Sequence, residues 1–295
     1  METVIEFLKA ILIGIVQGIT EWLPISSTGH MILLNDLVHL NVSDAFWEMF
    51  EVVIQLGSIL AVVVLYFSRL WPFALRKNIG GGDLLCGVGK VGIKRRTMVL
   101  WLHVLIAAVP AGVVGVLLND WFDAHFYNPV CVSLALIVYG VLFIVVERLH
   151  RGKTFGMNTA EDIGYGTALG IGAFQMLSLV PGTSRSGSTI LGASILSVSR
   201  PAAAEFSFFL AIPIMFGASG LRGLKYALKV AGGEAEMFGA TELAVLLVGT
   251  AVAFFVSLAV IKFLVSFVRR HSFESFGWYR IALGALVLVY FGLVR

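Results

Sequence analysis

Two short clusters of polar residues interrupt long apolar stretches of this chain, and they hold most of the residue types that do chemistry. The first cluster spans 17–30 and contains Gln17, Glu21, Ser27 and His30. A separation of four places Gln17 and Glu21 on one face of a helix. A carboxylate in apolar surroundings is costly unless a cation or a proton donor lies beside it, so we predict that Glu21 is a site residue.

The middle of this cluster is rich in hydroxyl groups. Pro24 is predicted to stop the first helix, and Ser26, Ser27 and Thr28 then begin the next one. Helix N-termini bind phosphate through unpaired backbone N–H groups and the helix dipole. Ser26 and Thr28 are therefore predicted phosphate ligands. A plain N-cap is the usual role of such a run in a soluble protein, but the neighbouring Glu and His favour a site.

Ser27 is the candidate nucleophile of the cluster. His30 follows it by three residues, so one helical turn would place the imidazole and the hydroxyl on the same face. Ser27 would then attack phosphorus with His30 or Glu21 as its base. The alternative is that a water molecule attacks and Ser27 only binds phosphate.

The second cluster, 181–189, centres on Arg185. An arginine in an apolar stretch needs an anionic partner, and its planar fork suits phosphate oxygens. The alternative is that Arg185 caps helix carbonyls. The cluster also supplies hydroxyl donors, which we predict to bind phosphate: Thr183, Ser184, Ser186, Ser188 and Thr189.

Together the two clusters suit phosphoryl chemistry. Glu21, Ser27, His30 and Arg185 are the predicted catalytic residues, and Gln17 is predicted to support Glu21. A carboxylate alone repels phosphate. Either a divalent metal ion bridges Glu21 to the ligand, or the acid is protonated.

The composition indicates that a lipid bilayer is the solvent of this chain. Of its 295 residues, 58% are hydrophobic and 13% are charged, and the mean hydropathy is +0.93. These values exclude a soluble single-core protein and a disordered chain. The net charge is only +3, with basic residues in short clusters, so no nucleic-acid partner is predicted.

The hydropathy pattern predicts membrane spans and two interrupted segments. The interrupted segments, 4–19 and 163–180, each end at one of the polar clusters, which favours re-entrant hairpins. Six runs are long enough, or nearly so, to cross the hydrocarbon core: 46–67, 97–118, 129–147, 204–221, 241–268 and 279–294.

The distribution of basic residues predicts the orientation. The loop 68–96 contains seven Lys or Arg residues and one acid, Asp83, so it is predicted to be cytoplasmic. Alternation then places 148–162 and the 269–280 turn, including Arg280, on the same side. Both chain ends are predicted to be extracytoplasmic.

The two polar clusters belong to similar halves of the chain. A shift of 158 lays residues 14–33 on 172–191 with six identities in twenty positions. Each half reads as a re-entrant segment followed by three spans, and an odd number of crossings inverts the second half. We therefore predict an all-α polytopic membrane protein, a single domain over 1–295. Six transmembrane helices and two opposed re-entrant hairpins form its inverted-topology repeat, about 1–150 and about 160–295.

The motif Gln-x-x-x-Glu at 17–21 and the motif Pro-Gly-x-Ser-Arg-Ser-x-x-Thr at 181–189 resemble the two signatures of the bacterial undecaprenyl-diphosphate phosphatase family, the bacitracin-resistance type. Nine positions fit the second motif without a gap, and the likeness extends over nearly the whole chain. It implies an inner-membrane enzyme that hydrolyses undecaprenyl diphosphate to undecaprenyl phosphate, recycling the carrier lipid for cell-wall synthesis. It also implies a periplasm-facing site and dependence on Mg²⁺ or Ca²⁺.

The first motif position is Glu in some members of that family and Gln17 in this chain. Glu21 would then hold the metal ion together with substrate oxygens. A lipid-phosphate flippase or anion transporter is the alternative function, because inverted repeats around a midplane anion site are also the architecture of alternating access. A purely structural scaffold would leave Glu21 and Arg185 without a role. The predicted partners are the polyprenyl diphosphate and membrane lipid, with a second copy in a homodimer as a further candidate.

Overall fold

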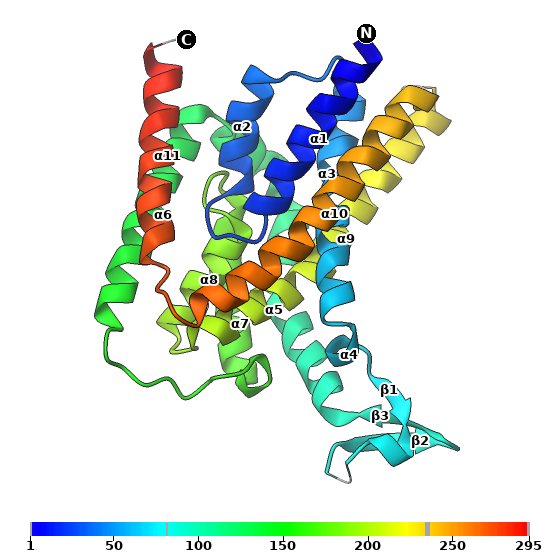
Figure 1. Cartoon of the computed structure of the whole chain (residues 1–295), viewed down its shortest axis with the longest axis vertical. Helices are drawn as coiled ribbons and strands as arrows, with labels where there is room; N and C mark the ends of the chain where they lie inside the picture. The colour runs from blue at the N-terminus through cyan, green and yellow to red at the C-terminus, as the bar shows by residue number, and fades with distance from the viewer. Residues whose placement is uncertain (1, 81, 234–236, 294–295) are drawn as a thin grey trace.

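The computed structural model describes residues 2–80, 82–233 and 237–293, and most of them are helical (Figure 1). Ser and Asn side chains cap several helix starts, and prolines mark others, as expected for helix N-termini. The α-helices are α1 (Glu2–Thr20), α2 (Ser27–Leu37), α3 (Asp44–Leu65), α4 (Phe67–Leu70), α5 (Arg95–Phe126), α6 (Pro129–Leu149), α7 (Tyr165–Met176), α8 (Arg185–Ile195), α9 (Arg200–Ala231), α10 (Ala240–Val268) and α11 (Glu274–Leu293).

Within the described residues, seven helices are long and apolar enough to cross a membrane, namely α1, α3, α5, α6, α9, α10 and α11. Each of the last six overlaps one of the six predicted spans; 46–67 extends two residues past the end of α3, and residue 294 of the span 279–294 lies outside the described residues. The seventh is Thr3–Thr20 in α1, which the sequence predicts as one arm of a hairpin rather than a span. The chain is thus a multi-pass membrane protein.

Helices α1 and α2 form a hairpin whose two ends lie together. The chain that leaves α2 returns to the start of α1, where Lys9 Nζ donates a hydrogen bond to the His39 carbonyl at 2.7 Å. The Asn41 N–H donates to Glu6 Oε2 at 3.0 Å. Figure 1 shows this pair opening toward the end of the molecule that carries both termini, with its turn at mid-height.

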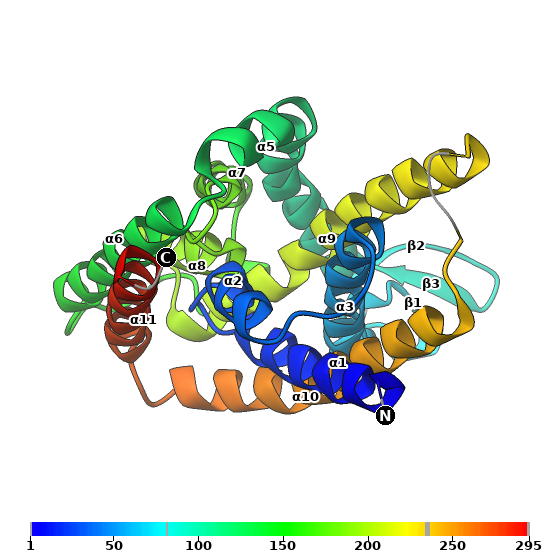
Figure 2. The same cartoon turned by 90° about the horizontal axis from the view of Figure 1, so that it is seen from above.

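Helices α7 and α8 form a second hairpin. The Ser199 N–H donates a hydrogen bond to the Met157 carbonyl at 2.9 Å, and Met157 pairs with Val198 in an isolated β-bridge. The segments before α7 and after α8 are therefore joined, as the two ends of the first hairpin are. In Figure 1 it opens toward the opposite end from the first hairpin. Seen from above, α2 and α8 lie in the middle, with the α6–α11 pair on one side and α3 and α9 on the other (Figure 2).

The predicted all-α membrane architecture is confirmed, and the loop after α3 adds a small sheet that the sequence analysis did not predict. There, β1 (Phe73–Leu75), β2 (Leu84–Val88) and β3 (Val91–Lys94) form an antiparallel sheet in the order β1-β3-β2. Strands of three to five residues, two of them containing a glycine, are too short for a reliable period of two. The sheet lies at the end of the molecule away from the termini (Figure 1).

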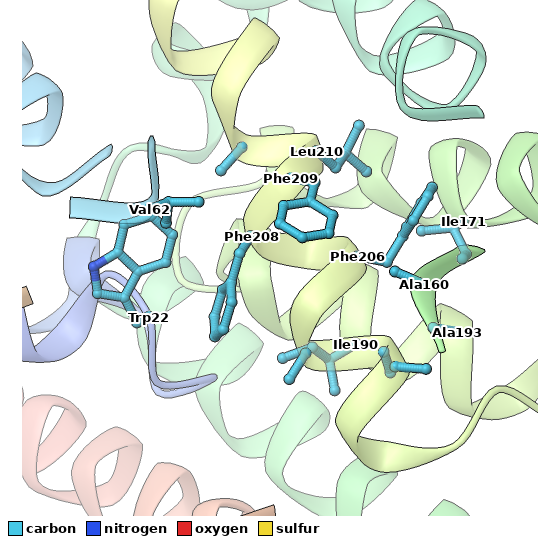
Figure 3. Close-up of a cluster of buried hydrophobic side chains, with 14 of the residues drawn as sticks. Trp22, Val62, Ala160, Ile171, Ile190, Ala193, Phe206, Phe208, Phe209 and Leu210 are labelled. Atoms are coloured by element: carbon cyan, nitrogen blue, oxygen red, sulfur yellow. The ribbon is translucent and has the colours of Figure 1, made fainter. Parts of the chain in front are cut away.

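The largest core cluster fixes the turn of the first hairpin. Trp22 follows α1 directly, is fully buried, and meets the Phe208 ring edge-on at 5.4 Å between centroids. Ile190 of α8 belongs to the same cluster (Figure 3). Aromatic contacts of this kind stabilise beyond the area that they bury. Helix α9, which carries Phe206, Phe208 and Phe209, therefore supports both hairpins.

Glycines at matching positions of the two hairpins allow close helix contacts. A Cβ on Gly14 would lie 2.6 Å from the Gly249 carbonyl oxygen of α10, and one on Gly172 would overlap the Ala107 carbonyl of α5.

We expect Gly14→Val and Gly172→Val each to lower the free energy of unfolding by about 1–3 kcal/mol. Gly217→Val is the matched control, because a Cβ there meets nothing within 4 Å. Thermal unfolding in detergent tests this, and equal stability of all three variants would contradict it.

Candidate active site

The turns of the two hairpins meet inside the protein. Arg185 Nη2, at the start of α8, lies 3.2 Å from Glu21 Oε1, just after α1. The next residue, Ser186, donates through its hydroxyl to the Glu21 carbonyl at 3.2 Å and to the Leu23 carbonyl at 3.3 Å. The two polar clusters, 164 residues apart at this ion pair, therefore form one site.

Glu21 lies at the centre of the contacts in this site. Its side chain is only 7% exposed. Oε2 accepts hydrogen bonds from Gln17 Nε2 at 3.0 Å and from Ser27 Oγ at 3.3 Å, while Oε1 faces Arg185. The predicted support of Glu21 by Gln17 matches this geometry. Three other sequence-predicted residues, Gln17, Ser27 and Arg185, thus share the Glu21 carboxylate.

Each hairpin turn ends in a serine with left-handed backbone geometry. Ser26 has φ 73° and Ser184 has φ 70°, and the two positions differ by the repeat offset of 158. Their hydroxyls accept from the Gly29 and Gly187 N–H groups at 3.3 and 3.1 Å. A non-glycine residue in this region costs about 1–3 kcal/mol, and such strain gathers at functional sites. Both helices therefore start at the site with unpaired N–H groups.

The two halves contribute different chemistry at matching positions. The offset lays Ser27 on Arg185, so a hydroxyl in one hairpin corresponds to a guanidinium in the other. It also lays Glu21 on Leu179, which leaves the second hairpin without a carboxylate there. Gln17 corresponds to Gln175, which is buried and, among the described residues, has no hydrogen-bond partner for either amide atom.

Arg185 has one nitrogen left for a ligand. Nη1 donates to the Ser207 carbonyl at 2.9 Å, and the guanidinium carbon lies 5.8 Å from the centre of the Trp22 ring. Nε is buried and has no hydrogen-bond partner in the part of the chain that the structure describes. Arg185 does donate to one helix carbonyl, as the capping alternative requires, but it also pairs with Glu21.

Several hydroxyls of the second cluster already have protein partners. Thr183 donates to the Leu177 and Val180 carbonyls at 3.0 and 2.8 Å. Ser188 donates to the Tyr139 hydroxyl at 3.2 Å, and Thr189 shares a 2.7 Å hydrogen bond with Ser207. Thr183 thus closes the turn of the second hairpin, and Ser188 and Thr189 fasten the hairpin to α6 and α9. Ser184 and Ser186 lie in the turn, 3.1 Å apart.

His30 is held by residues other than Ser27. Its Nδ1 lies 2.7 Å from the Ser26 carbonyl oxygen, and its Nε2 lies 2.7 Å from the Tyr279 hydroxyl. The imidazole also stacks on the Tyr279 ring at 5.7 Å. Both ring nitrogens are thus in use, and His30 links α2 to α11.

Arg280 is a site residue that the sequence analysis assigned to a cytoplasmic turn. It is fully buried in α11. Nη1 donates to the Pro24 carbonyl at 3.1 Å, and Nη2 donates to the Gly182 and Thr183 carbonyls, both at 2.9 Å. One guanidinium therefore holds both hairpin turns. The signal in the sequence is that Arg280 lies within the predicted span 279–294 rather than before it.

The protein side chains alone do not make a metal site. Among the described residues, no three His, Cys, Asp or Glu side chains lie together as metal ligands. Glu21 is the single carboxylate of the two clusters, and Gln17, Ser27 and Arg185 already surround it. With Arg185 paired to this one carboxylate and Arg280 buried at the same two turns, the site is better suited to an anion.

Comparison with known proteins identifies the family of this chain. Residues 10–286 match the family of bacitracin resistance protein BacA. An undecaprenyl-diphosphatase of Enterococcus faecalis is 52% identical over 285 residues, 97% of each chain. One from Acetivibrio thermocellus is 51% identical over 99% of this chain and 100% of its own, and one from Desulfitobacterium hafniense is 50% identical over 97% and 96%. The chain described here belongs to the bacitracin resistance protein BacA family.

Proposed function

We propose that this protein hydrolyses undecaprenyl diphosphate to undecaprenyl phosphate and inorganic phosphate, and so recycles the carrier lipid for cell-wall synthesis. The observation that carries the proposal is the contact of Glu21 with Ser27 and Arg185 where two helices begin. This arrangement supplies a nucleophile, a base and cationic donors within one buried site. Relatives with about half of their residues identical bear the name undecaprenyl-diphosphatase.

In the first step, Ser27 Oγ attacks the terminal phosphorus while its proton passes to Glu21, 3.3 Å away. A bond forms between Oγ and phosphorus, and the bond from phosphorus to the bridging oxygen breaks. The electron pair leaves with undecaprenyl phosphate, which takes the proton from Glu21. In the second step, water attacks the phosphoserine, gives its proton to Glu21, and Ser27 recovers a proton as phosphate leaves.

Glu21 is the better candidate for the base. Its Oε2 already accepts from the Ser27 hydroxyl, whereas both nitrogens of His30 contact Ser26 and Tyr279. We assign His30 a positioning role, because it fixes the first turn of α2. The mechanism with a directly attacking water keeps Glu21 as base and uses Ser27 as a phosphate ligand.

Developing charge on the phosphoryl oxygens is stabilised by fixed donors. These are the free Nε of Arg185, the first N–H groups of α2 and α8, and the Thr28 hydroxyl. Ser26, Ser184 and Ser186 shape this cradle at the two helix starts. Thr183, Ser188 and Thr189 support it through their contacts with the protein.

Two hollows suit the two ends of a lipid diphosphate. A cavity of about 530 Å³ lies along α2, and its lining runs from Met31, the residue after His30, to Asn35, Asp36 and His39, among others. A groove of about 510 Å³ between α6 and the second hairpin turn is lined by apolar side chains and ends at Tyr139 and Thr183. The first offers a path for water and headgroups, and the second a path for the polyprenyl tail.

For the membrane topology, we propose that both hairpins are re-entrant and that the two halves form an inverted repeat in the bacterial cytoplasmic membrane. The opposite openings of the hairpins in Figure 1 and the matched Ser26 and Ser184 support this. The basic loop 68–96 favours a cytoplasmic sheet, which leaves α2 and its cavity facing outward. The site would then open to the extracytoplasmic side.

Cysteine labelling tests this topology. His39 and Ser197 are both exposed and differ by the repeat offset of 158. With Cys86 and Cys131 replaced by serine, we expect an impermeant reagent added to intact cells to label His39→Cys and not Ser197→Cys. Labelling at His39→Cys should also slow hydrolysis, because this position lines the outer cavity. Labelling of both positions from the same side would refute the inverted repeat.

The activity itself is tested with purified protein in detergent. Undecaprenyl diphosphate should yield one phosphate and undecaprenyl phosphate, and Glu21→Gln and Arg185→Gln should abolish this. Glu6→Gln is a matched control, since Glu6 forms an ion pair with Lys9 outside the site. Absence of phosphate release, with translocation of a labelled lipid phosphate in vesicles, would instead establish a transporter.

The divalent cation is proposed to enter with the substrate, because the diphosphate supplies the oxygens that the chain lacks. Such a cation neutralises phosphate charge when bound. We expect a chelator to stop hydrolysis without changing the thermal stability of the substrate-free protein. Gln17→Glu should lower the Mg²⁺ concentration needed for half-maximal activity, since it adds a second carboxylate beside Glu21. A chelator-induced loss of stability would mean that the protein holds the cation by itself.

A further inference from the structure

The small sheet after α3 has one apolar and exposed face. In the antiparallel register, Phe73 lies opposite Ile93 and Leu75 lies opposite Val91, so these four side chains share a face. Cys86, opposite Ile93 in the β2–β3 pair, joins them. Phe73, Leu75 and Val91 are 45%, 45% and 47% exposed. Such a cluster is unusual on a water-facing surface.

The other face of the sheet is covered by its own chain. A Cβ on Gly87 would lie 3.1 Å from Arg76 Cδ. One on Gly92 would lie 2.7 Å from Leu84 Cδ1 and 2.8 Å from Ile79 Cδ1. The sheet is therefore two-sided: over the residues that the structure describes, its Gly92 face packs against the sheet's own chain, and its Phe73 face is left for an external partner.

The apolar face continues a strip of exposed side chains that begins on a membrane span. Leu60 and Val64 of α3 are 44% and 57% exposed, and Phe67 and Trp71 follow at helical spacing with 52% and 49%. The Phe67 and Trp71 rings stack at 5.4 Å, and Trp71 meets Phe73 at 5.5 Å. The lipid-facing side of α3 thus passes without a break onto the sheet.

Basic residues surround this face. Lys77 and Lys90 lie at the two turns of the sheet, and Arg95 and Arg96 lie at the start of α5, all four exposed. The one acid of this loop, Asp83, accepts a hydrogen bond from the Arg96 N–H at 2.8 Å and so caps α5. The segment is left with a strong positive charge next to its aromatic side chains.

We propose that the sheet docks with its apolar face on the membrane surface and binds anionic phospholipid headgroups through the basic residues around it. Aromatic side chains favour the level of the headgroups, and basic residues near an anionic leaflet are attracted to it electrostatically. Continuity with the lipid-facing side of α3 selects lipid over a soluble partner. Docking of the sheet does not depend on the catalytic mechanism. With the loop 68–96 on the cytoplasmic side, the leaflet that the sheet meets is the cytoplasmic one.

Cys86 provides a natural reporter on this face. In a Cys131→Ala background, an environment-sensitive dye on Cys86 is followed in nanodiscs that hold one copy of the protein. The discs contain either phosphatidylcholine alone or phosphatidylcholine with phosphatidylglycerol. We expect blue-shifted emission in the anionic discs and at least about twofold stronger quenching by lipids brominated on their acyl chains. Both leaflets are alike in these discs, so the result does not depend on orientation.

Charge variants make the test specific. Replacing Lys77, Lys90 and Arg96 together by glutamine should remove the difference between the two disc types. A matched triple replacement of Arg151, Lys153 and Arg270, exposed basic residues outside the sheet, should preserve it. Hydrolysis in detergent checks that each variant is folded. Equal quenching in both lipids would overturn the proposal, as would shielding of the dye only in discs that hold two copies, which would indicate a second chain on this face.

Discussion

Ser27→Ala is expected to lower kcat on undecaprenyl diphosphate by at least about 10³-fold, which is the scale of losing a nucleophile whose function water replaces poorly. The physical reason is the 3.3 Å contact that places the Ser27 hydroxyl against Glu21 at the start of α2. Steady-state phosphate release by purified protein measures the effect. Ser219→Ala is the matched control, because that buried hydroxyl of α9 has no partner among the described residues.

The same variant separates the two mechanisms. If Ser27 is the nucleophile, rapid acid quench of the wild-type protein with labelled substrate traps a phosphoserine at Ser27. If water attacks directly, no phosphoserine forms, and Ser27→Ala raises KM more than it lowers kcat. A Ser27→Ala variant with wild-type kcat and KM would contradict both roles and the assignment of the site.

Arg280→Met is expected to lower the free energy of unfolding by about 3–5 kcal/mol and to abolish hydrolysis. The substitution leaves the carbonyls of Pro24, Gly182 and Thr183 inside the protein without their donor, and each buried unsatisfied group costs about 1–3 kcal/mol. Because these carbonyls belong to both hairpin turns, Glu21 and Arg185 should lose their alignment. Thermal unfolding followed by tryptophan fluorescence measures the stability.

Arg148→Met makes the same chemical change at an exposed position. The Arg148 side chain is 55% exposed and pairs with Glu274 at 2.8 Å, so we expect its loss to change stability by less than about 1 kcal/mol. Arg280→Lys should fall between the wild type and Arg280→Met, since one ammonium group reaches fewer of the three carbonyls. If Arg280→Met and Arg148→Met are equally stable, Arg280 does not hold the two turns together.

The sequence determined the membrane elements because the bilayer imposes a simple rule on them. A span needs about 20 apolar residues with every backbone group bonded inside the helix, and this requirement is visible in any single run of hydropathy. Each of the six predicted spans accordingly overlaps one long apolar helix. Charged side chains in apolar segments are costly, and this cost is visible in the sequence without knowledge of tertiary contacts. Glu21 and Arg185 thereby indicated the two clusters that the structure brings together.

Other features depended on contacts between distant segments. The sheet at 73–94 consists of strands too short to show a period, and its register arises only when the three strands pair. Arg280 was interpreted as a loop cation because charge at the end of an apolar run usually lies in water. Its burial follows from α11 packing against both hairpin turns, which lie about a hundred or more residues away in the chain.

The division of roles inside the site was also decided by the tertiary structure. From the sequence, His30 and Glu21 were equal candidates for the base, and five hydroxyls of the second cluster were equal phosphate ligands. In the folded protein, His30 contacts the Tyr279 hydroxyl, and Thr189 hydrogen-bonds with Ser207. Spacing along a helix predicts which side chains share a face. The contacts of that face depend on the neighbouring helices. The sequence by itself therefore determined the two clusters that gather at the site, and the packing of α6, α9 and α11 around the turns added Arg280 and determined which side chains remain free to act.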